Sequence, residues 1–218
     1  MGPEAPAHGN ARTVTATGTG WAEAPPDLML VSVGVECRAG SVEEAYAAAA
    51  EGLAMTGSVL RGHGVAPADI RSAGMSVRAD LAWRDGEGQK LVGYVAASSV
   101  TVRLRDIATA SATISAAVDA AGDSARLNNL QLVLSDDTAV RAEAREAAWH
   151  DALRTAGQYA ALASARLGPV LSVTDQRPSP GPVPLAGMQR ASAPEGMTVE
   201  PGANRVEATV TATWALEQ

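Results

Sequence analysis

The chain has 218 residues, 46 of them alanine, with no phenylalanine, one cysteine and a net charge of −7. This length suffices for a hydrophobic core, but large apolar side chains are few, which suggests extra burial through self-association. No run approaches the roughly 18–20 apolar residues of a membrane span, a single lysine in an acidic chain disfavours nucleic acid as a partner, and one cysteine excludes an intrachain disulfide.

The first predicted elements are two strands and a helix. Threonines alternating with small residues predict a strand over 13–20, where two glycines indicate close approach of another backbone. After a proline break, period-two alternation predicts a half-buried strand over 28–38. Ser41 and Glu44 form a capping box, and an apolar stripe from Val42 to Leu60 predicts a helix that ends at 62–64.

A hairpin is predicted next, with Asp85-Gly-Glu-Gly88 as its turn. The returning strand covers about 90–105, and it is followed by a helix over 107–121 and a strand over 127–134. The outgoing strand has one apolar face, which comprises Met75, Val77, Ala79, Leu81 and Trp83.

The longest predicted helix covers about 138–165, with Ser135-Asp-Asp as its cap. Its expected buried side is mostly small, formed by Val140, Ala144, Ala148, Ala152 and Ala156, with Tyr159 and Leu162 later. A short strand over 170–174 follows. Six prolines then indicate a Pro-rich loop over 178–202, before a closing strand that alternates regularly from Val206 to Leu216.

This order of elements predicts an α+β fold, with a largely antiparallel sheet and about three helices packed on one face. The expected organisation is a disordered tail over 1–12 and a single domain over 13–218 that includes the Pro-rich loop. The first ten residues lack the features of a signal peptide, so the chain as written is expected to be cytoplasmic. The alternative is a periplasmic or secreted protein whose signal has been removed.

No catalytic, cofactor-binding or metal-binding residue is predicted. The three histidines lack metal-ligand spacing, and His63 is expected at a helix C-terminus. Cys37 shares the apolar register of its strand, which favours a small buried hydrophobe over a reactive thiol. Gly18-Thr-Gly20 fails the dinucleotide-binding pattern at Glu23. The chain is therefore predicted not to be an enzyme and to need no cofactor.

Interface anchors are the remaining candidates. Trp21 follows the first strand and Trp83 precedes the hairpin turn, whereas Trp214 is expected in the core. The Pro-rich loop adds four further interface candidates: Pro182, Pro184, Leu185 and Met188.

Four motifs together resemble the SIMPL-domain family. The family's opening strand and the "A-P-D" break that follows it resemble Val14-Thr-Ala-Thr-Gly-Thr-Gly20 and Ala24-Pro-Pro-Asp27. Its "GYxA" strand resembles Leu91-Val-Gly-Tyr-Val-Ala96, and its "L-S-D" helix entry resembles Leu134-Ser-Asp136. The resemblance covers about 13–216, although the break here contains a second proline.

The resemblance implies an α+β domain that forms ring-like homo-oligomers in bacterial relatives, loosely linked to envelope and oxidative stress, without known catalytic residues. We therefore expect a non-enzymatic, self-assembling scaffold whose partner is itself. The alternative is an adaptor that recruits an unknown protein partner in a stress response. The exposed closing strand and the Pro-rich loop are the expected contact regions.

Overall fold

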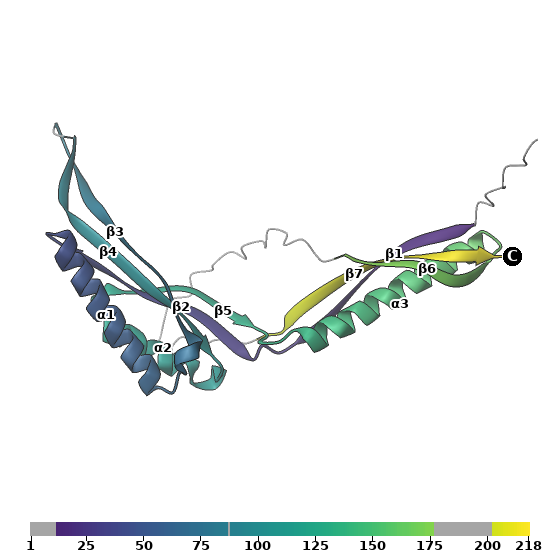
Figure 1. Cartoon of the computed structure of the whole chain (residues 1–218), viewed down its shortest axis with the longest axis horizontal. Helices are drawn as coiled ribbons and strands as arrows, with labels where there is room; N and C mark the ends of the chain where they lie inside the picture. Colours follow the sequence, from purple (N-terminus) through teal and green to yellow (C-terminus); the bar gives the residue numbers. More distant parts are fainter. Residues whose placement is uncertain (1–11, 87, 177–201) are drawn as a thin grey trace, which may run out of the picture. The chain divides into compact units, whose positions relative to one another are not determined.

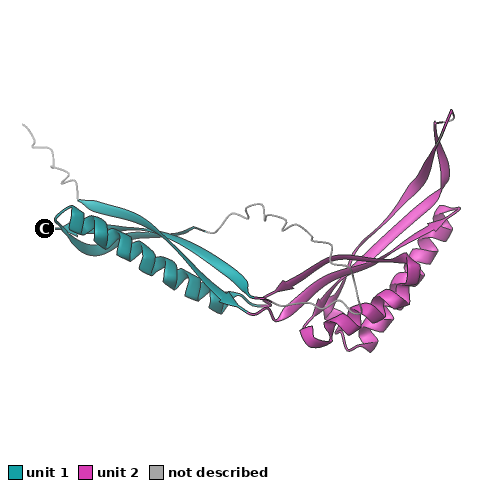
Figure 2. Cartoon of the chain, turned by 180° about the vertical axis from the view of Figure 1, so that it is seen from behind, with its two compact units in different colours: residues 1–24, 136–190, 203–218 teal, residues 25–135, 191–202 magenta. Residues whose placement is uncertain are grey.

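The computed structural model describes residues 12–86, 88–176 and 202–218. The chain divides into two compact units: unit 1 comprises residues 1–24, 136–190 and 203–218, and unit 2 comprises 25–135 and 191–202 (Figure 2). The region expected as one domain is thus divided in two. The expected tail lies outside the described residues except for Arg12, whose carbonyl accepts a hydrogen bond from the Leu216 amide.

The elements follow the predicted order and confirm an α+β fold (Figure 1). Unit 1 contains β1 (Thr13–Ala24), α3 (Thr138–Leu162), β6 (Arg166–Gln176) and β7 (Asn204–Glu217). Unit 2 contains β2 (Leu28–Ala39), α1 (Val42–Gly62), η1 (Pro67–Asp69), β3 (Ile70–Arg84), β4 (Gly88–Leu104), α2 (Ile107–Ala121), η2 (Gly122–Ser124) and β5 (Ala125–Val133).

The strands form two sheets, not the single sheet expected. Unit 1 has the order β1-β7-β6 and unit 2 the order β3-β4-β2-β5, and all pairs are antiparallel. Alternation shows which face of a strand is buried but not which strand lies beside it. The closing strand, expected to be exposed, is the central strand of its sheet, hydrogen-bonded on both edges.

Close packing of α3 on β1 defines the core of unit 1. A Cβ added at Gly18 would lie 2.2 Å from the Ala148 carbonyl oxygen, and one at Gly20 would lie 2.2 Å from the Ala148 amide nitrogen. The predicted close approach at the two glycines is therefore confirmed. The predicted helix stripe is buried from Val140 to Ala156 and continues to Ala160, and Trp214 is the largest buried side chain opposite it.

Two residues expected on that stripe are exposed. Tyr159 and Leu162 point away from the core because the buried positions recur every fourth residue and reach Ala160 instead. At the start of the helix, the expected Ser135-Asp-Asp cap is confirmed for its two aspartates, with Asp137 as the N-cap residue. The Asp136 carboxylate accepts the Thr138 amide at 2.9 Å, while Ser135 bonds elsewhere.

The core of unit 2 lies between one face of its sheet and the helices α1 and α2 (Figure 1). The Ser41 cap predicted at the start of α1 is confirmed, because the Ser41 hydroxyl accepts the Glu44 amide at 3.2 Å. His63 is the C-cap residue of this helix, as expected. The buried side chains are mostly large and aliphatic, among them Met29, Val31, Val33, Leu60, Val100, Val102 and Ile114.

Candidate interaction surfaces

The two titratable groups with lowered pKa values bind structural partners. Asp69 is almost buried at the end of η1, and its carboxylate accepts two hydrogen bonds from the Arg105 guanidinium, each 2.9 Å long. These bonds and the nearby charges of Arg105 and Arg103 lower the pKa of Asp69. The arrangement joins η1 to the end of β4 and leaves both carboxylate oxygens occupied.

Asp27 connects two of the motifs noted in the sequence. Its carboxylate accepts the Ser135 hydroxyl and the Ser135 amide, both at 2.6 Å, and these hydrogen bonds lower the pKa of Asp27. Both residues lie at the limits of unit 2, where the chain passes to unit 1. Hydrogen bonds within unit 2 thus join the "A-P-P-D" and "L-S-D" motifs.

The open face of the unit 2 sheet carries a network of ion pairs. Glu36 lies within 3.8 Å of Arg38, 3.7 Å of Arg78 and 3.4 Å of Arg126. Glu36 and Arg126 line a concavity of about 530 Å³ between β3, β4, β2 and β5. Three guanidinium groups share this one carboxylate, and Arg38 also lies 3.4 Å from Asp80, so the network carries a net positive charge.

Neither a cluster of metal-ligating side chains nor a membrane-spanning helix is present among the described residues. No group of three or more His, Cys, Asp or Glu side chains there could hold a metal ion. None of the helices in the described part of the chain is both long and apolar enough to cross a bilayer. Cys37 is half-buried on β2 and packs at the margin of the cluster formed by Val35, Ala45 and Ala49.

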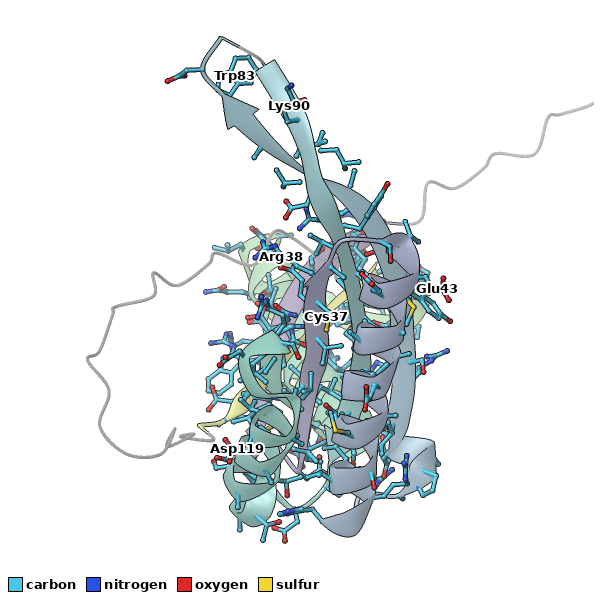
Figure 3. All side chains as sticks on the ribbon, turned by 90° about the vertical axis from the view of Figure 1, so that its left-hand side faces the viewer. Cys37, Arg38, Glu43, Trp83, Lys90 and Asp119 are labelled. Atoms are coloured by element: carbon cyan, nitrogen blue, oxygen red, sulfur yellow. The ribbon has the colours of Figure 1, made fainter. Side chains whose placement is uncertain are left out.

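The two tryptophans predicted as interface anchors are both exposed, in different units. Trp21 of unit 1 is 53% exposed, and the Arg205 guanidinium lies 4.5 Å from its ring centroid. Trp83 of unit 2 is 72% exposed near the tip of the β3–β4 hairpin (Figure 3). Trp214 is buried as expected, and its ring lies 5.6 Å from that of Trp149.

Trp83 belongs to the apolar face that was predicted for the outgoing strand of the hairpin. In the structure this face is exposed. Met75, Val77, Leu81 and Trp83 project from one face of β3, and Leu91 is paired with Leu81 on β4. We call these five residues the hairpin face. Period-two alternation predicts an apolar face correctly, but it does not show whether another element covers that face.

A second exposed apolar strip lies on β6 and was missed by the sequence analysis. By register, Val170 is opposite Trp214 and Val173 is opposite Ala212, so both face the α3 side of the sheet. Neither they nor Leu171 is buried, because α3 packs on β1 and β7. The other four interface candidates, Pro182, Pro184, Leu185 and Met188, lie outside the described residues.

Comparisons with known proteins agree with the motifs. The model of the SIMPL family, described as proteins of unknown function (DUF541), matches residues 14–214. Over 181 residues the chain is 26% identical to the "26 kDa periplasmic immunogenic protein" of Brucella melitensis and to the protein of the same name from Brucella abortus. Each alignment covers 79% of this chain and 70% of the relative. Because the family model matches nearly the whole chain, the protein belongs to the SIMPL family.

Proposed function

We propose that this protein is a non-enzymatic, self-assembling scaffold that forms a ring-like homo-oligomer. The observation that carries the proposal is the position of its scarce large apolar side chains. A chain without phenylalanine leaves Trp83, Leu81 and Leu91 at least half exposed on one hairpin and three further aliphatic residues exposed on β6. Contiguous apolar surfaces of this kind are typical of protein interfaces.

The state of the charged groups supports a structural role. Asp27 and Asp69, whose pKa values are lowered, are both held by hydrogen bonds that join chain segments. A general acid or base for work near neutral pH needs a pKa moved toward that range. The pKa values of these two groups move the other way, which suits structural anchors.

We also propose that the scaffold works outside the cytoplasmic membrane and contributes to tolerance of envelope or oxidative stress. The Brucella relatives are named as periplasmic proteins. This supports the alternative location considered from the sequence. Fractionation of cells that express the native gene tests the location, and recovery with the cytoplasmic markers would contradict it.

The native mass tests self-assembly. Light scattering coupled to size exclusion, at micromolar concentrations, should give a multiple of the 22.2 kDa chain mass. Negative-stain electron microscopy of the same fraction should show closed particles. A mass equal to one chain across the concentration range would overturn the proposal and favour the adaptor interpretation, which requires no self-association.

A further inference from the structure

The hairpin face continues the core face of the unit 2 sheet beyond its helical cover. Val77 is paired with Ala96, which is fully buried against Ala45 and Ala49 of α1. Further along the hairpin, Leu81 and Leu91 are paired on the same face but are exposed. Trp83 lies near the tip, which projects beyond the start of α1 (Figure 3). In the described part of the chain, no second layer covers the apolar face of the sheet there.

A groove lies alongside the same strand, next to α1. It encloses about 450 Å³, and its helix side is formed largely by small residues, Ala50, Ala54 and Gly57, with Met75 on the strand side. Tyr46, one turn before Ala50 on the same helical stripe, is 53% exposed. The small side chains leave space beside the edge strand β3 for a large apolar group.

We propose that two copies of the chain pair through this surface, with the hairpin of each copy covering the α1–β3 groove of the other. Trp83 of the hairpin face and Met75, which also lines the groove, lie on the same strand at equal distances on either side of Ala79. An antiparallel two-fold pairing therefore places Trp83 of each copy against Met75 and Ala54 of the other, with the two Ala79 residues near the axis. Ala79 is exposed and small enough for close approach.

The apolar area exposed on this surface is large enough for a second copy of the chain to bind there. At their exposed fractions, the hairpin face and Tyr46 offer roughly 600 Å² per copy, given that one aromatic side chain covers about 150–250 Å². Two copies together then bury roughly 1,200 Å², which reaches the range of specific interfaces. The face is also self-complementary, because one copy supplies both the large side chains and the space that receives them.

This pairing rests on the proposed self-assembly and names one of its contacts. A two-fold contact uses the same surface on both copies and closes on itself, so it builds dimers and not rings. A ring needs a second, different contact. The exposed strip of Val170, Leu171 and Val173 on β6 is the remaining large apolar surface among the described strands.

Cross-linking at the axis gives a direct test. In a Cys37→Ala background, which removes the single native thiol, Ala79→Cys should react with a bismaleimide about 10 Å long, the spacing of packed sheets, to give a covalent dimer. Ser76→Cys is the matched control, because Ser76 lies on the opposite face of the same strand. Equal cross-linking at both positions, or none at Ala79→Cys, would overturn the pairing.

Interface variants provide the second measurement. Trp83→Ala removes the anchor and Ala54→Phe fills the groove, and each should raise the dissociation constant at least about 30-fold, the effect of losing one strong interface anchor. Trp21→Ala, an equally drastic change at an exposed tryptophan of unit 1, should leave this constant unchanged. Circular dichroism confirms that each variant is folded.

The outcomes separate the two proposals. A monomeric wild-type chain overturns both self-assembly and the pairing. A wild-type oligomer whose mass persists in Trp83→Ala and Ala54→Phe overturns the pairing alone and leaves self-assembly standing. A lower mass in both variants, together with Ala79→Cys cross-linking, supports the pairing.

Discussion

The two compact units bury a helix against a sheet in opposite ways. In unit 1, alanines of α3 lie directly on the backbone of β1 at Gly18 and Gly20. Among the described residues of this unit, Trp214 is the only large side chain that is fully buried. In unit 2, valines, leucines and a methionine fill the space under α1 and α2. The apolar face of unit 2 then continues as an uncovered hairpin.

The difference indicates where each unit is sensitive to substitution. Alanine removes little apolar area from water, so the stability of unit 1 depends on very close contact and on a single large side chain. Unit 2 distributes its burial over many large side chains, and the loss of any one is shared with its neighbours. We therefore expect substitutions at a few positions to unfold unit 1, whereas unit 2 should tolerate substitution at most of its positions.

The largest effect is expected from replacing both glycines of β1. Gly18→Ala together with Gly20→Ala would place two methyl groups 2.2 Å from backbone atoms of α3, so the helix must move away. Overpacking typically costs about 1–3 kcal/mol per site, and more where backbone must shift, so we expect loss of folded unit 1. Hydrogen exchange read by mass spectrometry should show lost protection in β1, α3 and β7, with unit 2 still protected.

Gly157→Ala is the matched control for this change. Gly157 lies in α3 with nothing within 4 Å of an added Cβ. Alanine there should stabilise the helix by up to about 1 kcal/mol. If the β1 double variant keeps its protection, the close helix–strand contact is not what holds unit 1 together.

The next largest loss of stability is expected from truncating one core residue in each unit. Trp214→Ala removes the largest buried side chain of unit 1 and its contact with Trp149, so we expect a loss of about 3–5 kcal/mol. Leu60→Ala in unit 2 should cost about 2–3 kcal/mol, because neighbouring aliphatic side chains can move into the space. Urea unfolding followed by circular dichroism gives both values, and a larger loss for Leu60→Ala would reverse the comparison.

A smaller effect concerns pH and unit 2. Because the pKa of Asp69 is lowered in the folded chain, its bonds to Arg105 stabilise the fold above the unfolded-state pKa of about 3.9 and are lost as pH falls through the lower folded value. Asp69→Asn should cost about 1 kcal/mol at pH 7, since Arg105 is largely exposed, and should flatten the loss of stability as pH falls below about 4. Thermal unfolding across this range measures both.

Asp119→Asn is the control for the pH prediction. Asp119 is exposed on α2, so this variant removes the same charge without affecting the bonds between Asp69 and Arg105. Its pH profile should match that of the wild type. If Asp69→Asn also matches the wild type, the two hydrogen bonds to Arg105 do not contribute to acid stability.

Local sequence patterns predicted the helices and strands well, because these elements depend on residues that are neighbours in the sequence. The capping residue of α1, the hairpin turn and the alternation of β7 each depend on side chains a few positions apart. Even the close contact at Gly18 and Gly20 was predicted, since glycine in a strand indicates an approaching backbone. The division into two sheets depends on pairing between β1 and β7, almost 200 residues apart, which no local pattern records.

The candidate surfaces could be predicted only in part for the same reason. The alternation of Met75, Val77, Leu81 and Trp83 indicated an apolar face, but the position at which α1 begins leaves that face exposed. Likewise, the exposure of Val170 and Val173 follows from the position of α3 over β1 and β7. The partners of Asp27 and Asp69 lie far away in the sequence, so the residues around these two carboxylates could not predict the hydrogen bonds that they accept.

The smallest effect tests whether Trp21 is an anchor for another molecule or a residue of unit 1 alone. Its ring lies under the Arg205 guanidinium, whose Nε is also 3.1 Å from Glu207. An exposed cation–π contact contributes about 0.5–1 kcal/mol, so Trp21→Ala and Arg205→Gln should each destabilise unit 1 by that amount. The double variant should cost little more than either single one, because both remove the same contact. Fully additive losses in urea unfolding would show that the two side chains act separately, and a reduced native mass in Trp21→Ala alone would make this tryptophan an interface residue.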